Sequence, residues 1–215
     1  IGKSSETANP TADGTGGGVL DAFIHDYFNR SGNLVTVPGV VPQGVIATGG
    51  VISDYTESGT DYRAHVFTSS GSFVVSELGN LGNTIEYLVV AGGGAGGGGA
   101  YNGGGGGAGG YRTGTGVPIS VGSYPITVGA GGAGANTDTT GNDGGDSVFN
   151  APGSEGTTKF TSTGGGGGGA HDASPRGGAP GGSGGGGSQA QGTPGTGNTP
   201  PTSPAQGYPG SGNWY

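Results

Sequence analysis

The chain has 215 residues, of which 60 are glycine and 13 are proline, so these two types supply about a third of it, against roughly an eighth in ordinary proteins. Only 29% of the residues are hydrophobic and 9% are charged, and the formal net charge is −8. This composition excludes a conventional globular enzyme fold throughout the chain. Six basic residues without a cluster argue against nucleic-acid binding. No apolar run is long enough to predict membrane insertion, and the lack of cysteine excludes disulfides and thiolate metal sites.

Glycine is unevenly distributed along the chain. Residues 1–90 hold 14 of the 60 glycines, and the composition changes sharply near Val90. We therefore predict three parts: an attachment or oligomerisation segment over residues 1–50, an antiparallel β unit over residues 51–90, and a glycine-rich domain over residues 91–215.

The predicted elements begin with one short α-helix near residues 19–30, where five apolar side chains lie on one helical face: Leu20, Phe23, Ile24, Tyr27 and Phe28. Runs of β-branched and aromatic residues then predict strands over 34–37, 44–48, 51–55, 62–68, 72–77 and 84–90. Ser70 and Gly71 predict a hairpin turn between two of them. Shorter strands are expected inside the glycine-rich part, at 117–121, 124–128, 147–149 and 157–163.

The glycine runs admit three interpretations. Composition alone favours a flexible linker. Collagen requires glycine at every third position, and the uninterrupted run from Gly103 to Gly107 breaks that period. An ordered region needs another source of stability, because fixing each glycine backbone costs about 1–2 kcal/mol of conformational entropy. A bundle of polyglycine II helices, with three residues per turn and hydrogen bonds between neighbouring helices, supplies it. The predicted fold class is therefore mainly β with a polyglycine II bundle and one short N-terminal helix.

Candidate sites for chemistry are few. The three histidines, His25, His65 and His171, share no metal-binding spacing, and no Ser/His/Asp ordering stands out, so we predict no catalysis, no cofactor and no strong metal site. One weak candidate for Ca²⁺ comprises Asp138, Asn142, Asp143 and Asp146, but it lacks the terminal glutamate of a calcium loop. The alternative for this cluster is a set of turns that leads into the next strand.

Aromatic residues beside the glycine runs are better candidates for binding, because large side chains on an uncharged scaffold are suited to stacking on sugars or to protein contacts. The alternative is that they cap the ends of the bundle. The candidate binding set, with its polar neighbours, is Tyr101, Asn102, His171, Asp172, Arg176, Trp214 and Tyr215.

Several stretches resemble, in their order, the glycine-rich domains of structural and tail-fibre proteins of tailed bacteriophages, marine phages especially. They include residues 62–73, 85–94 and 109–114, followed by 124–132, 144–149 and 161–167. The resemblance covers about residues 50–215. It implies a virion surface protein whose glycine runs form a sandwich of polyglycine II helices, with loops at one end that recognise host surface molecules.

The resemblance leads us to expect a non-enzymatic virion protein, a tail-fibre or adhesin segment for host attachment. Its expected partners are other virion proteins or copies of itself, and a host cell-surface glycan or protein. One alternative is a self-assembling extracellular filament or capsid-decoration protein, since exposed backbone edges favour lateral association. A third is an ice-binding protein, although regular rows of small polar side chains are not evident.

Overall fold

The computed structural model describes residues 43–99, 102–136, 138–153, 156–171, 177–188 and 192–212. Residues 42–215 form one compact unit. The helix predicted near residues 19–30 and most of the predicted attachment segment lie outside the described residues. The described residues form strands and extended runs and contain no helix, so this part of the chain is mainly β.

Nine strands are defined among the described residues. They are β1 (Ile46–Thr48), β2 (Val51–Glu57), β3 (Thr60–Val66), β4 (Gly71–Glu77), β5 (Thr84–Val90), β6 (Tyr111–Pro118), β7 (Gly122–Thr127), β8 (Ser147–Gly153) and β9 (Gly156–Ser162). Most of the strand predictions within the described residues are confirmed. One is shifted, because β6 spans 111–118 instead of 117–121 and Ile119 and Ser120 lead into a turn.

The strands form three antiparallel sheets. One has five strands in the order β1-β4-β7-β8-β9, and the pairs β2–β3 and β5–β6 form two smaller sheets. The hairpin predicted at Ser70 and Gly71 is wrong, because β3 pairs with β2 while β4 pairs with β1 and β7. The large sheet combines β1 and β4, from before residue 90, with β7, β8 and β9 from the glycine-rich part.

The chain leaves the large sheet at Gly49 and Gly50, whose φ angles are 110° and 65°. These left-handed conformations favour glycine. A Cβ on Gly49 would also overlap the carbonyl oxygen of Ser72. The two glycines therefore redirect the chain from β1 into the separate ribbon formed by β2 and β3.

An aromatic cluster forms the hydrophobic core beneath the sheets. Tyr124 is fully buried, and its ring centroid lies 6.1 Å from that of Phe73 and 6.2 Å from that of Phe149. Tyr87 from β5 packs against Phe160 of β9, with ring centroids 4.2 Å apart. The Tyr124 hydroxyl accepts a hydrogen bond from the N–H of Ser120 at 2.9 Å, so its one polar atom is paired.

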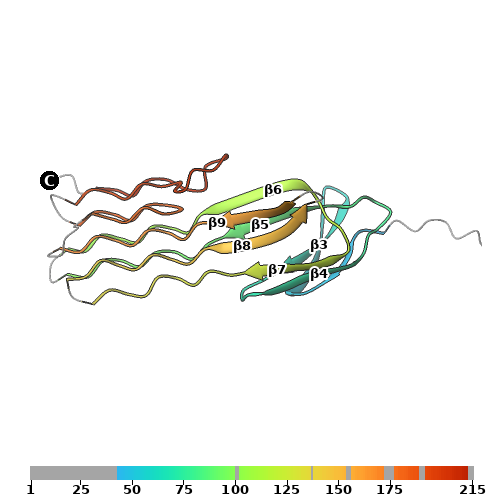
Figure 1. Cartoon of the computed structure of the whole chain (residues 1–215), viewed down its shortest axis with the longest axis horizontal. Helices are drawn as coiled ribbons and strands as arrows, with labels where there is room; N and C mark the ends of the chain where they lie inside the picture. Colours follow the sequence, from blue (N-terminus) through green and yellow to red (C-terminus); the bar gives the residue numbers. More distant parts are fainter. Residues whose placement is uncertain are drawn as a thin grey trace, which may run out of the picture. The chain divides into compact units, whose positions relative to one another are not determined.

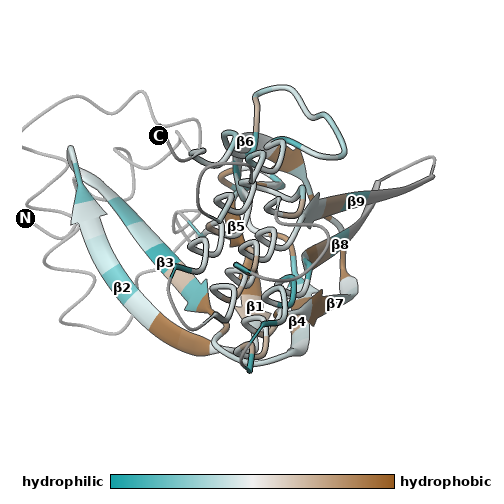
Figure 2. Cartoon of the chain, turned by 90° about the vertical axis from the view of Figure 1, so that its left-hand side faces the viewer, coloured by the Kyte–Doolittle hydropathy of each residue, from teal (hydrophilic) through white to brown (hydrophobic). Residues whose placement is uncertain are grey.

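Extended glycine runs continue directly from five of these strands (Figure 1). Residues 91–99 and 102–110 lie between β5 and β6, and residues 129–136 and 138–146 lie between β7 and β8. Residues 163–171 follow β9, and the later runs 177–188 and 192–212 join them. Viewed along the long axis, the runs form a cluster of coils whose axes lie side by side (Figure 2).

Backbone hydrogen bonds join these runs at every third residue. The N–H groups of Ala91, Gly94 and Gly97 donate to the carbonyls of Gly110, Gly107 and Gly104, at 3.0, 2.8 and 2.8 Å. The next N–H along the same run bonds elsewhere: those of Gly92, Ala95 and Gly98 donate to Gly145, Asn142 and Thr139. A single run thus pairs with different neighbours in rotation.

Candidate functional site

The centre of the bundle is the run from Thr163 to Ala170, here called the central run. Every N–H from Thr163 to Gly169 donates a hydrogen bond, and every C=O from Thr163 to Ala170 accepts one. Residues 164–170 are all buried. Because all these backbone carbonyls and the amides as far as Gly169 have partners, this run is held without a hydrophobic side chain larger than a methyl group.

The partners of the central run follow a three-residue cycle. The amides of Gly164, Gly165 and Gly166 donate to Asp146 Oδ1, Gly92 O and Ser183 O, each at 2.9 Å. The amides of Gly167, Gly168 and Gly169 repeat the cycle with Asp143 Oδ1, Ala95 O and Gly186 O, at 2.7, 2.8 and 2.9 Å. Two carboxylates three residues apart thus replace two backbone carbonyls of the pattern.

Glycine is required in the central run because its neighbours lie at backbone contact distance. A Cβ on Gly164, Gly165, Gly166, Gly167 or Gly168 would overlap a carbonyl oxygen of an adjacent run. The Cα–H bond that replaces the Cβ points at the same oxygen, which is the arrangement of a weak Cα–H···O contact. The lack of a Cβ in glycine therefore accounts for both the close packing and the weak Cα–H···O contacts.

The structure gives part of the predicted calcium cluster a different role. Asp143 and Asp146 accept the amide hydrogen bonds described above, while Asn142 uses its backbone carbonyl to accept from Ala95. Asp138 is exposed, with a φ of 60°. No group of three or more acidic, histidine or cysteine side chains able to hold a metal occurs among the described residues. Calcium binding stays a prediction. The hydrogen-bonding roles are observed, and residues 141–146 form an extended run, so among these four residues only Asp138 lies in a turn.

The predicted binding residues that the structure describes lie at the end of the bundle far from the sheets. Asn102 is exposed, and His171 donates its N–H to the carbonyl of Gly98 at 3.4 Å. Gly98 in turn donates to Thr139 at 2.8 Å, so residues from three different runs meet here. The other members of the binding set, Tyr101, Asp172, Arg176, Trp214 and Tyr215, lie outside the described residues.

Sequence reasoning missed two polar residues that hold the bundle. Gln206 is 2% exposed, and its Oε1 accepts from the Thr163 amide at 2.8 Å while its Nε2 donates to the carbonyl of Pro200 at 3.1 Å. Ser188 is 1% exposed, and its hydroxyl donates to the carbonyl of Ala170 at 2.7 Å. The only signal was a polar residue inside a glycine-rich stretch, which equally suits a turn.

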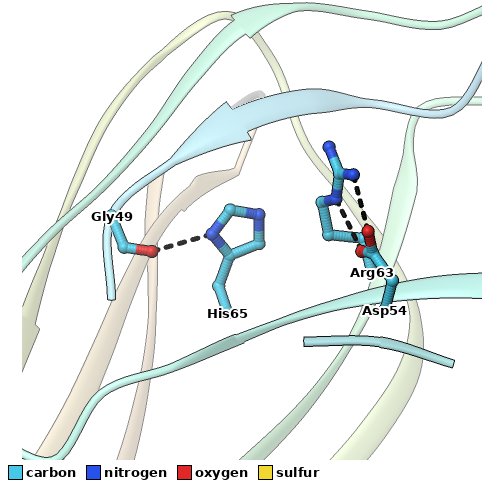
Figure 3. A network of polar contacts seen from close by, with 4 residues as sticks. All are labelled: Gly49, Asp54, Arg63 and His65. Atoms are coloured by element: carbon cyan, nitrogen blue, oxygen red, sulfur yellow. Dashed lines mark hydrogen bonds and ion pairs between the residues drawn. The ribbon is translucent and has the colours of Figure 1, made fainter. Parts of the chain in front are cut away.

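The β2–β3 ribbon has a polar face with its own contacts (Figure 3). Arg63 donates to both carboxylate oxygens of Asp54, at 2.7 and 2.8 Å, and the ring nitrogen Nδ1 of His65 lies 2.8 Å from the carbonyl oxygen of Gly49. The hydrogen bond from Arg63 lowers the pKa of Asp54 and raises the pKa of Arg63 itself. Both side chains are more than half exposed, so the pair contributes little stability.

The other face of the ribbon is apolar and exposed. Val51 pairs with Val66, and Tyr55 pairs with Tyr62, whose ring is stacked on it with centroids 5.2 Å apart. Val51 is 67% exposed, Tyr55 48% and Val66 47%. A two-stranded ribbon in water is marginally stable by itself. The ribbon is therefore a surface that gains stability from any contact that covers these side chains.

Comparison with known proteins places the chain in a family. Residues 68–215 match the glycine-rich domain family, and because this match covers more than half of the chain, the protein belongs to that family. The matched span begins before β4 and includes both the strands and the glycine runs that extend from them. No curated protein and no solved structure matches the chain. Among the described residues, no helix has the length and apolar character needed to cross a membrane.

Proposed function

We propose that the glycine runs form a bundle of polyglycine II helices. A β-strand hydrogen-bonds with at most two neighbours, whereas the central run bonds with runs 91–99, 102–110, 138–146 and 177–188. Both orientations occur, because the central run is antiparallel to 102–110 and parallel to 91–99. A three-residue repeat with outward-pointing backbone groups is the property of the polyproline II helix that makes such packing available to glycine.

On this scaffold the chain serves as a non-enzymatic structural protein of a virion surface, a tail-fibre or adhesin segment of the bacteriophage type. The β sheets form its base, and the bundle holds turns at the far end against a host cell-surface glycan or protein. The observation that carries this proposal is the fully hydrogen-bonded central run, which makes a rigid support for the turns that contain Asn102 and His171. The order of glycine-rich motifs, which resembles that of phage fibre proteins, supports it.

Binding of the fluorescently labelled full chain to a panel of bacterial cells and to their purified surface glycans tests this function. We expect saturable binding that falls at least tenfold in the double variant Asn102→Lys and His171→Ala. The matched control Thr84→Lys introduces the same charge at an exposed position of β5, outside the β2–β3 ribbon, and is expected to bind as the unaltered chain does. Equal binding by the double variant, or no saturable binding to any cell, would contradict the proposal.

A second candidate function is favoured by the ribbon. Exposed apolar side chains at Val51, Tyr55 and Val66 suit a protein that assembles with copies of itself into a filament or a capsid decoration. Electron microscopy over a range of protein concentrations separates the two candidates. Filaments that form without any cell binding, and that are lost in the variant Val51→Ser with Tyr55→Ser, would replace host attachment as the function.

A further inference from the structure

One edge of the bundle has almost no side chains and has unpaired backbone groups. This open edge is the run from Gly103 to Gly110, in which Ala108 carries the only side chain. The amides of Gly104, Gly107 and Gly110 donate to the central run. Among the described residues, the N–H and C=O groups of Gly103, Gly106 and Gly109 make no hydrogen bond with another part of the chain.

These groups recur at every third residue, so they continue the repeat by which the other runs are joined. Gly103 and Gly106 are exposed, and Gly105 has no atom within 4 Å of the position that a Cβ would occupy. The open edge therefore offers donors and acceptors at about 9 Å intervals, which is three residues of a polyproline II helix. It is the counterpart, in this lattice, of an uncovered edge strand in a β-sheet.

The opposite side of the bundle is less suited to backbone contact with a further helix. Its outer run has exposed side chains three residues apart, at Ala130, Ala133 and Asn136. The neighbouring run adds the exposed carboxylates of Asp143 and Asp146. Side chains at every repeat hold an incoming backbone away along this whole run, whereas the open edge has one methyl group, at Ala108. The two carboxylates of one copy also repel those of another. Of these two sides, the open edge is therefore the one better suited to backbone contact with a further helix.

The chemistry of the open edge defines what binds it. A partner must bring backbone groups with the same three-residue spacing, and it must lack side chains where the two backbones touch. Residues 91–111 contain no charged residue, so two copies of this edge meet without repulsion. We propose that the open edge binds the open edge of a second copy of this chain, forming a twofold dimer in which the polyglycine lattice continues across the interface.

The proposed contact uses the same open edge on both partners, which is a twofold arrangement. When the same patch is used by both partners, the assembly closes at two copies and does not grow into a fibre. A contact along one helix is small and replaces hydrogen bonds to water, so the dimer belongs to the weak class that forms at high local concentration. Such concentrations arise wherever several copies are carried side by side.

Sedimentation velocity on the full chain over a wide concentration range tests the proposal, with the variant Gly105→Lys and the control Gly134→Lys. Both positions have open space around an added Cβ, so both variants keep the fold, but Gly134 lies in the outer run of the opposite side. We expect a concentration-dependent dimer for the unaltered chain and for Gly134→Lys, and a monomer for Gly105→Lys. The proposal is overturned by a monomer at every concentration, or by equal dimerisation of Gly105→Lys.

Amide hydrogen exchange on the unaltered chain gives a second test that needs no variant. The amides of Gly103, Gly106 and Gly109 are expected to exchange several times more slowly at dimer-forming concentration than in dilute solution. Exchange rates that do not change with concentration would contradict the dimer. The inference uses the observed lattice and not host attachment, so Gly105→Lys should still bind cells if the proposed function is correct.

Discussion

The β sheets and the glycine bundle, which are the two regions of the compact unit, each form a buried interior, but they bury different groups. In the β base, buried aromatic side chains such as Tyr124 and Phe149 exclude water, and the strands pair in the usual antiparallel manner. In the glycine bundle, the buried element is the backbone of residues 164–170. The comparison teaches that a chain with few hydrophobic residues can still form a buried interior, provided that its peptide groups bond with each other in three dimensions.

The regions also respond to side chains in opposite ways. Removing atoms from the aromatic core of the sheets leaves a cavity, whereas adding a single methyl group at Gly164 to Gly168 of the central run causes overlap with a carbonyl oxygen. The two regions are nevertheless continuous, because the glycine runs extend directly from the ends of strands β5, β6, β7, β8 and β9 (Figure 1). Substitutions in each region therefore test whether the two unfold together.

The largest effect is expected from Tyr124→Ala in the base. Tyr124 is fully buried at the centre of the aromatic cluster, so we expect the free energy of unfolding to fall by about 3–5 kcal/mol, as for other large aromatic truncations. Urea unfolding followed by circular dichroism measures it. The matched variant Tyr124→Phe removes only the hydroxyl and should cost about 1 kcal/mol. A loss below that of Tyr124→Phe would show that the base is not the main source of stability.

A smaller loss is expected from Gly167→Ala in the central run. The added methyl group would overlap the carbonyl oxygen of Gly141, so the neighbouring runs must separate, at about 1–3 kcal/mol. Gly96→Ala is the control, because its Cβ would lie 3.5 Å from the nearest atom, the carbonyl oxygen of Gly104. Equal stability of the two variants in urea would contradict the packing described for the bundle.

Removing one carboxylate from the bundle should have a still smaller effect. Asp143→Ala leaves the amide of Gly167 without its acceptor. Because Asp143 is exposed and water can reach this side, we expect a loss of about 1 kcal/mol. Faster amide exchange at Gly167 would locate the effect. Glu86→Ala, which removes the same charge from an exposed position on β5, should change stability by less than about 0.5 kcal/mol.

The smallest effect concerns the ribbon. The hydrogen bond from Arg63 holds the pKa of Asp54 below its ordinary value, so this carboxylate favours the folded ribbon above the ordinary pKa. That contribution is lost as the pH falls through the lowered pKa. An NMR titration should show the lowered pKa of Asp54 in the unaltered chain and its return toward the ordinary value in Arg63→Gln. An identical pKa in both proteins would mean that the pair does not form in solution.

Local sequence patterns were reliable where an element depends on its own residues. The strands at 51–55, 72–77 and 84–90 were identified because β-branched and aromatic side chains favour extended backbone. The pairing of the strands was not identified. The turn predicted at Ser70 and Gly71 suggested a hairpin of β3 with β4, whereas β4 pairs with β1 and β7. A pattern of two residues per repeat indicates a strand but does not identify its partner.

The candidate site likewise has residues that the sequence identified and residues whose roles only the structure shows. Asn102 and His171 were selected because they stand beside glycine runs, and the structure places both at the far end of the bundle. The hydrogen-bonding roles of Asp143, Asp146 and Gln206 were not found, because each bonds with a residue at least 18 positions away. Contacts of that kind leave no local spacing that a sequence pattern can detect.

By itself, the sequence determined that this protein cannot rely on a conventional hydrophobic core, that its strands precede and interrupt glycine runs, and that those runs are not collagen. The tertiary structure alone decided which runs touch, that residues 163–170 lie at the centre, and that residues 103–110 form an open edge. The physical reason is that glycine has only a hydrogen atom as its side chain, so a glycine run has no pattern of apolar and polar residues that indicates its neighbours. Their positions in the bundle are set by the strands that lead into them and by hydrogen bonds between distant backbone groups.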